Sequence, residues 1–332
     1  MRIDNREIDC GKPVFIVAEA GINHNGSIEI AKEMIEVASS CRVDAIKFQT
    51  LFPEELFSER TNPEWFEMIK KWSLTKTQHL DLMIHAKKNQ IEFFSTPVGI
   101  RSAKLLKEIN VKTIKIASGE LTNHDLIRFV AKTRIPMILS TGMSTLSEIL
   151  AAVDIIKNEN CPFVLLHCNA SYPSPVEDAN LLNIPYLRNI FDVPVGYSDH
   201  TIGNETCLAA VSLGACIIEK HFTLNKKMEG PDQKLSADPK NFEDLVSKIR
   251  IVEKTLGKVR FGPTNSEKKF RKTMRKSVAA KIDLKAGTKI KKSMLSLIRP
   301  GVGISPALIN NVVGCTIKTN VKRGTLLDWN MF

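Results

Sequence analysis

The stretch Ala45-Ile46-Lys47-Phe48-Gln49-Thr50 is a short apolar run whose polar side chains gather toward its carboxyl end. Seven similar runs recur before Phe222, and amphipathic segments of helical periodicity separate most of them. Apolar strands that alternate with helices indicate a parallel sheet. Eight such units in about 250 residues predict an α/β fold, the (β/α)8 TIM barrel. The eight predicted strands are Val14–Ala20, Ala45–Thr50, Glu92–Thr96, Thr113–Ser118, Pro136–Thr141, Phe163–Cys168, Pro194–Asp199 and Cys216–Phe222.

Polar or ionisable residues stand at the carboxyl end of nearly every predicted strand. In a barrel of this type the active site is built at these strand ends. The sequence therefore predicts that they converge on one site. In chain order they are Glu19, Lys47, Gln49, Ser95, Thr96, Lys115, Ser118, Ser140, Thr141, His167, Ser198, Asp199, His200, Glu219, Lys220 and His221.

Two histidines, His200 and His221, end the seventh and eighth predicted strands. Adjacent strand ends can bring both imidazoles to one point. Two imidazoles, with carboxylates and water completing the shell, suit Mn²⁺ or a similar divalent metal better than a closed structural zinc site. The alternative is a pair of hydrogen-bonded histidines without a metal. His24, in the turn after the first strand, is a secondary candidate.

Three strand-end lysines, Lys47, Lys115 and Lys220, predict an anion site. Hydroxyl groups of Thr96, Ser118 and Ser198 can complete a cradle for a phosphate and a carboxylate. One of the lysines could instead form a Schiff base, which would leave the histidine pair unexplained. Three carboxylates at or beyond strand ends are candidates for proton transfer or for ion pairs with these lysines: Glu19, Glu120 and Asp232.

The charge distribution indicates two domains and a linker. Residues 264–332 carry 15 Lys and Arg against 3 Asp and Glu, a balance of +12, whereas residues 1–263 hold the remaining 32 and 33, a balance of −1. We predict a barrel over 1–262, a linker over 263–276 and a small, mostly β domain over 277–332. The basic run 268–276 has one aromatic residue and no recognised nucleic-acid motif, which favours a solvated linker helix over a nucleic-acid site.

The composition also bears on location and redox state. Seven cysteines, with no C-x-x-C pair, predict reduced and mostly buried thiols. No apolar stretch approaches the roughly 20 residues of a membrane span. The polar first residues lack the apolar core of a signal peptide. We therefore expect a cytoplasmic protein that binds neither membrane nor nucleic acid.

Taken together, these segments resemble the sialic acid synthase family, and the resemblance covers almost the whole chain. The tail resembles the antifreeze-like (SAF) domain that ends such enzymes. The matching segments are Ala18–Gly26, Ile46–Thr50, Phe94–Pro97, Lys115–Glu120, Ser140–Met143, Gly196–Thr201, Ile218–Thr223, Gly230–Asp232, Ser277–Lys281, Lys285–Thr288 and Ile298–Gly301.

The resemblance implies an activity, a metal and an assembly. Such enzymes join phosphoenolpyruvate to an N-acylated mannosamine-type sugar, giving a nine-carbon 2-keto-3-deoxy acid and phosphate. They use a divalent metal, commonly Mn²⁺. They are homodimers in which the antifreeze-like domain of one subunit covers the barrel of the other. The resemblance thus implies a transferase with a divalent metal as its cofactor.

The resemblance also implies roles for individual residues. His200 and His221 would hold the metal. Glu120 would handle the water that attacks C2, and Arg299 would reach the partner's sugar. Phosphoenolpyruvate would be held by Lys47, Thr96, Lys115, Ser118 and Ser198. The sugar or the intermediate would be contacted by Glu19, Gln49, Tyr172 and Asp232.

One departure from the family pattern concerns Ala170, where some members carry Asn. Either Asn169 substitutes for that residue or the contact is absent. The segment Leu51–Asn62 also looks short, so the identity of the sugar stays open between N-acetylmannosamine and diacetamido-trideoxy hexoses.

Two rival functions remain. One is another phosphoenolpyruvate-dependent 3-deoxy-ulosonate synthase on the same barrel. The antifreeze-like tail is evidence against this function, because such synthases lack that domain. The other is an inactive barrel whose basic tail binds polyanions.

Overall fold

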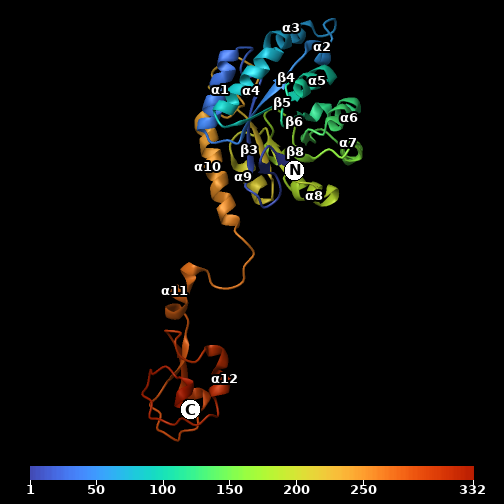
Figure 1. The fold of residues 1–332 in the computed structure, drawn as a ribbon. Coiled ribbons are helices and arrows are strands. Elements are labelled where there is room, and N and C mark those ends of the chain that lie inside the picture. Colours follow the sequence, from blue (N-terminus) through green and yellow to red (C-terminus); the bar gives the residue numbers. More distant parts are fainter. The chain divides into compact units, whose positions relative to one another are not determined.

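The computed structural model describes residues 1–332, which form two compact units, Met1–Gly257 and Lys258–Phe332 (Figure 1). In the first unit eight parallel strands close into a barrel in the order β10-β3-β4-β5-β6-β7-β8-β9. All eight predicted strands are confirmed, with ends shifted by at most two residues. They are β3 (Phe15–Gly21), β4 (Ala45–Thr50), β5 (Glu92–Pro97), β6 (Ile114–Ile116), β7 (Met137–Ser140), β8 (Phe163–Cys168), β9 (Val195–Asp199) and β10 (Ile217–His221).

Helices surround the strands, as Figure 1 shows for α1, α4 to α8 and α10. The amphipathic segments that separate most of the predicted strands are helices, and the structure adds the helices α2, α3 and α8. The short α3 begins at a proline and buries Phe66, Ile69 and Trp72 on one face. The helices of the barrel unit are α1 (Ile28–Ser40), α2 (Pro53–Leu56), α3 (Pro63–Trp72), α4 (Lys76–Lys88), α5 (Ile100–Glu108), α6 (His124–Thr133), α7 (Leu146–Asn158), α8 (Asn183–Phe191), α9 (Glu205–Ser212) and α10 (Pro239–Leu256).

Side chains alternate between the two faces of each barrel strand, because the side-chain period of a strand is two residues. On β3, Ile16 and Ala18 belong to the large cluster that packs against the helices, whereas Phe15 and Val17 belong to a separate cluster inside the barrel. Continuing this alternation places Glu19 inside the barrel, above Val17. The barrel interior is thus apolar near the amino ends of the strands and polar near their carboxyl ends.

A short antiparallel hairpin closes the amino end of the barrel. It consists of β1 (Arg2–Ile3) and β2 (Arg6–Glu7). Ile3 and Ile8 are buried in the interior cluster with Phe15 and Ile217. The hairpin was not predicted from the sequence, and it leaves the carboxyl end as the open face of the barrel.

The second unit has a small core of its own around Val278, Ile290, Val312 and Leu327. Its elements are α11 (Asn265–Met274), β11 (Ser277–Ala280), β12 (Leu295–Ile298), α12 (Ile309–Val312) and several 3-10 turns. The strand that begins at Ser277, β11, pairs antiparallel with β12. The segment 315–319 forms one isolated bridge, between Thr316 and Lys289.

None of the helices is both long enough and apolar enough to span a membrane. All seven cysteines are free thiols, and five of them are buried. The prediction that most of the cysteines are buried is confirmed.

Candidate active site

A cavity of about 200 Å³ opens among the carboxyl ends of the barrel strands. It brings together ten of the thirteen residues predicted from the sequence. Because they come from seven different strands and the loops that follow them, only the closed barrel assembles them. These ten residues are Glu19, Lys47, Gln49, Thr96, Lys115, Ser118, Tyr172, Ser198, His200 and His221.

Lys47 is the centre of a buried ionic network. Its Nζ lies 3.1 Å from Glu19 Oε2, 3.2 Å from Glu219 Oε2 and 3.2 Å from Thr96 Oγ1. Burial opposes its charge, but Glu19 and Glu219 outweigh that effect and raise the pKa of Lys47. The side chain is therefore cationic at neutral pH.

Lys115 lies on the opposite side of Glu219. Its Nζ donates to Ser140 Oγ over 2.6 Å and lies 3.6 Å from Glu219 Oε1. Ser198 Oγ donates to the same carboxylate oxygen over 2.9 Å. Burial lowers the pKa of Lys115 from its usual value. Two buried ammonium groups thus share one carboxylate, Glu219, which fixes the positions of both.

The two carboxylates of the network differ in their pKa values. Burial is the main reason that the pKa of Glu19 is raised to about 7. Burial would also raise the pKa of Glu219, but Lys115 and Lys47 lower it to about 2. A pair of carboxyl groups with separated pKa values is a common arrangement for acid–base work. Glu19 can exchange a proton near neutral pH, whereas Glu219 stays ionised.

Ser118 is held by the turn after β7. Gly142 N donates to Ser118 Oγ over 3.0 Å, and Cys168 Sγ lies 3.0 Å from the same oxygen. A side chain at position 142 could not be accommodated, because its Cβ would lie 2.8 Å from Cys168 Sγ and 2.9 Å from Ser118 Oγ. The glycine is therefore required for the close approach that orients the hydroxyl.

His200 and His221 face each other, with ring centroids 5.5 Å apart. His200 Nδ1 is hydrogen-bonded to the carbonyl oxygen of Asn169, which leaves Nε2 free. His221 Nδ1 is buried without a hydrogen-bond partner. Burial lowers the pKa of both histidines, and that of His221 falls to about 3, with His200 as the second cause. Both rings are neutral at pH 7, so each offers a lone pair.

These two imidazoles fit a metal ion that keeps open positions. In the whole structure no group of three or more His, Cys, Asp or Glu side chains is arranged to hold a metal. Asp232 is the nearest carboxylate, with Oδ2 3.9 Å from His221 Nδ1. A divalent ion here would take two protein ligands and complete its shell with water or substrate oxygens. The carbonyl that fixes the tautomer of His200 is the kind of outer contact that metal-binding histidines usually have.

Three predicted residues lie outside the main cavity. Asp232 lines a small adjoining cavity with Tyr172, His200 and His221. Glu120 does not line either space, and its Oε2 accepts a hydrogen bond from Asn123. Arg299 lies in the second unit, where its Nε donates to the carbonyl oxygen of Met274.

Lys220 was wrongly grouped with the other strand-end lysines. It lies on the outer face of β10, because it alternates with Glu219 and His221, which point inward. Its Nζ contacts Asp199 Oδ2 and donates to Thr201 O, so it stabilises the loop that carries His200. His24 is also outside the site; it is buried beside Phe48, and its Nδ1 accepts from Gly26 N.

Sequence reasoning did not single out several residues of the cavity. They include Glu219 and Ser140, which were noted only as strand ends, and Met143 and Cys168. The signal for Glu219 was present, because it is two residues before His221 and must share its face. Asn169 does not take the place of a side chain at Ala170, since its amide is engaged by Asp178 O and Ser171 N.

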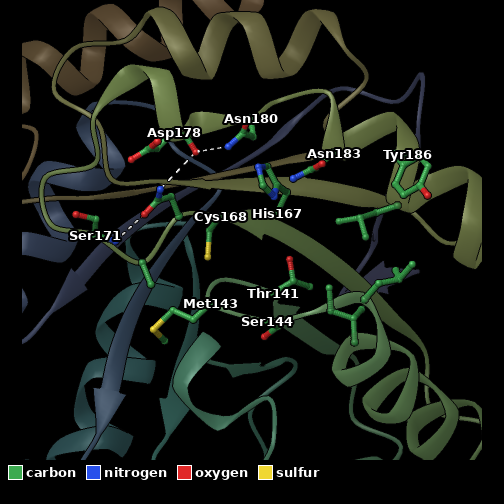
Figure 2. A pocket seen from close by; sticks show the side chains of 15 residues that line it. Thr141, Met143, Ser144, His167, Cys168, Ser171, Asp178, Asn180, Asn183 and Tyr186 are labelled. Carbon is green, nitrogen blue, oxygen red and sulfur yellow. Dashed lines mark hydrogen bonds between the residues drawn. The ribbon is translucent and has the colours of Figure 1, made fainter.

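A larger cavity of about 770 Å³ lies beside the site, between the loops after β7 and β8. Figure 2 shows His167, Cys168 and Asn183 on one side of it and Thr141, Met143 and Ser144 on the other. It shares Met143, Cys168 and Ala170 with the main cavity. No lysine or arginine lines it, so it offers no site for an anion.

The chain was compared with known families and structures. The NeuB family model matches residues 34–261, and the SAF domain model matches residues 275–332. An N,N'-diacetyllegionaminic acid synthase of Legionella pneumophila is 39% identical over 348 residues, covering 98% of each chain. An uncharacterized protein of Methanocaldococcus jannaschii is 43% identical over 331 residues, covering 99% of this chain and 98% of its own.

Among solved structures, an N-acetylneuraminic acid synthetase of Leptospira borgpetersenii in complex with citrate is similar, with a TM-score of 0.78 and 40% identity. The match covers 81% of this chain and 94% of that one. The agreement extends over both the barrel and the tail of the sequence, since the two family models together span most of the chain.

Proposed function

Because this chain belongs to the NeuB family, we propose that it joins phosphoenolpyruvate to an N-acylated mannosamine-type aminosugar with the help of a divalent metal. The chain is a phosphoenolpyruvate-dependent nonulosonic acid synthase, a transferase. The proposal adds the kind of acceptor, the metal and the roles of individual residues. The product is a nine-carbon 2-keto-3-deoxy acid, and phosphate is released.

One observation carries the proposal: two buried lysines and a pair of neutral histidines face the same cavity. Lys47 and Lys115 suit the phosphate and carboxylate of phosphoenolpyruvate, because a buried ammonium group interacts strongly with an anion. His200 and His221 suit a metal beside the acceptor aldehyde. An anionic donor and an electrophilic acceptor can therefore lie side by side.

The residues then have separate tasks. Lys47 and Lys115, with the hydroxyls of Thr96, Ser118 and Ser198, hold and orient phosphoenolpyruvate. Gln49, Tyr172 and Asp232 contact the sugar. His200 and His221 would hold a divalent ion, which would supply Lewis-acid polarisation of the aldehyde.

The reaction forms one carbon–carbon bond and expels one phosphate. The enol carbon of phosphoenolpyruvate attacks the aldehyde carbon, and water attacks the cationic C2 that results. The tetrahedral adduct loses phosphate to give the 2-keto acid. Glu19 is the best placed group for proton transfer, because its pKa of about 7 lets it accept and return a proton. Glu120 is less suitable, since it lies outside the cavity.

We further propose a homodimer in which the tail of one chain completes the site of the other. The support is the family membership together with the basic tail and its exposed Arg299. Only Nε of this guanidinium is hydrogen-bonded within the unit. The remaining nitrogens are available to a sugar held by a partner subunit.

The proposed function is tested with a panel of acceptors. N-acetylmannosamine and 2,4-diacetamido-2,4,6-trideoxymannose are each incubated with phosphoenolpyruvate and Mn²⁺, and the products are identified by mass spectrometry. We expect one sugar to give a nine-carbon acid together with an equal amount of phosphate. If neither sugar is converted while phosphoenolpyruvate is condensed with an unacylated aldose, the aminosugar assignment is wrong and the rival ulosonate synthase is favoured.

Lys115→Ala should raise the KM for phosphoenolpyruvate by at least about tenfold and alter the sugar KM much less, because one buried charged contact to the donor is lost. Steady-state kinetics with each substrate varied in turn provide the measurement. Lys112→Ala is the matched control, since Lys112 lies on the same segment but is exposed. An unchanged KM for phosphoenolpyruvate with a raised sugar KM would show that the two subsites are exchanged.

A further inference from the structure

A fourth cavity of the barrel unit, of about 330 Å³, has a strongly cationic lining that the proposed reaction does not use. It lies between the loops that follow β9 and β10 and the first turns of α10. Five lysines line this space, against the two acids Glu205 and Asp244. We call it the lysine pocket; its lysines are Lys220, Lys226, Lys234, Lys240 and Lys248.

Only part of this positive charge is neutralised within the protein. Lys248 pairs with Asp244 over 2.7 Å, and Lys226 lies 4.0 Å from Asp238. Lys234 and Lys240 are exposed and have no carboxylate within 4.0 Å. Two ammonium groups without a carboxylate partner therefore line one cavity, and an anion bound there would be attracted by both.

The lysine pocket shares wall residues with a small cavity beside the catalytic centre. A small cavity lined by Tyr172, His200, His221 and Asp232 also includes Lys220 and Leu235. Both of these residues line the lysine pocket as well. The main cavity, the small cavity at the histidines and the lysine pocket therefore follow one another across the open face of the barrel.

Comparison with the cavity of Figure 2 shows that the cationic lining is specific to one side. The cavity in Figure 2 adjoins the donor side of the site, through Met143, Cys168 and Ala170, and contains no lysine or arginine. The lysine pocket adjoins the histidine side, where the proposed acceptor sits. A general excess of lysine on the protein surface would place lysines around both cavities, and not around one of them alone.

We propose that the lysine pocket binds a phosphate group, with Lys234 and Lys240 as its principal charged contacts. The phosphate has two conceivable carriers: the far end of the acceptor sugar, which would extend from His221 past Leu235, or a separate phosphate-bearing anion. Lysines act as mobile point charges and suit a tetrahedral dianion without fixing one orientation. The first carrier rests on the proposed function, whereas the second does not.

The first experiment compares N-acetylmannosamine with N-acetylmannosamine 6-phosphate as acceptors. If the sugar carries the phosphate, the wild type has a KM for N-acetylmannosamine 6-phosphate that is lower than its KM for N-acetylmannosamine by about tenfold or more. The double variant Lys234→Gln/Lys240→Gln loses this difference between the two KM values. The control Lys227→Gln/Lys254→Gln removes the same amount of charge from exposed lysines outside the pocket, and it should keep the wild-type preference for the phosphorylated sugar.

The second experiment measures binding of inorganic phosphate by calorimetry with phosphoenolpyruvate saturating the catalytic lysines. If a separate anion is the ligand, phosphate binds to the wild type and to the control pair but at least about tenfold more weakly to the Lys234/Lys240 variant. This measurement needs no turnover, so it also decides the matter if the proposed synthase activity fails. The proposal is overturned if neither the sugar preference nor the phosphate binding depends on Lys234 and Lys240.

Discussion

Replacing His200 or His221 by alanine is expected to lower kcat/KM by at least about two orders of magnitude, the loss that follows when a Lewis acid is removed from a reacting aldehyde. Burial lowers the pKa of both imidazoles, so each is neutral at pH 7, and each variant would lose one of the two proposed protein ligands. The measurement is phosphate release with the preferred sugar in the presence of Mn²⁺. His124→Ala is the matched control, because His124 is exposed at the start of α6 and outside the cavity.

Chelation provides the companion measurement. An excess of chelator should abolish turnover of the wild type, and added Mn²⁺ should restore it. Metal binding can be followed separately by electron paramagnetic resonance. The signal of free Mn²⁺ should weaken when the wild type is added and should persist when either histidine variant is added. Full activity in excess chelator would falsify the metal assignment and leave the histidines as hydrogen-bonding groups.

The sequence was sufficient for the barrel because the pattern is local. Each strand is a short apolar run, and each carboxyl end carries polar groups, so strands and their order follow from the chain alone. The same rule predicts that Lys47 and Gln49 share one face of β4. Applied consistently, it also separates Lys220 from His221, which reasoning by strand ends alone did not do.

Other features depend on tertiary packing and could not be predicted in this way. The raised pKa of Glu19 and the lowered pKa of Glu219 arise from the burial of four charged groups brought together from β3, β4, β6 and β10. The orientation of Ser118 depends on the backbone of Gly142, which approaches from another strand end. Such contacts join residues that are far apart in the chain, so no local sequence pattern predicts them.

The distribution of acidic groups explains why the carboxylates were hardest to assign. Glu19 lies on a barrel strand, and its position follows from alternation. Glu120 and Asp232 lie in loops after β6 and β10, where no period fixes the direction of a side chain. Asp232 reaches the histidines, whereas Glu120 is engaged with Asn123. Strand position therefore predicted the place of Glu19, whereas a position in a loop led to the site for Asp232 but not for Glu120.

Mixing two inactive variants, Arg299→Ala and His221→Ala, should restore activity if the tail of one chain serves the barrel of another. In a mixed dimer one site combines the intact barrel of the Arg299→Ala chain with the intact arginine of the His221→Ala chain. The other site receives neither. Random exchange of equal amounts gives half mixed dimers with one working site each, so about a quarter of wild-type activity is expected for a symmetric homodimer.

Three features favour Arg299 as the residue exchanged. It is exposed, it stands before Pro300 in a segment that resembles the antifreeze-like domain of the family, and its guanidinium can bind an acyl or hydroxyl oxygen with several donors. Lys289→Ala serves as the control in the same unit, since Lys289 is also exposed but lies away from Arg299 in sequence and should keep full activity alone. Subunit exchange must be verified independently, by mass spectrometry of differently tagged chains. If mixed dimers form and no activity returns, Arg299 acts within its own chain or has no part in the reaction.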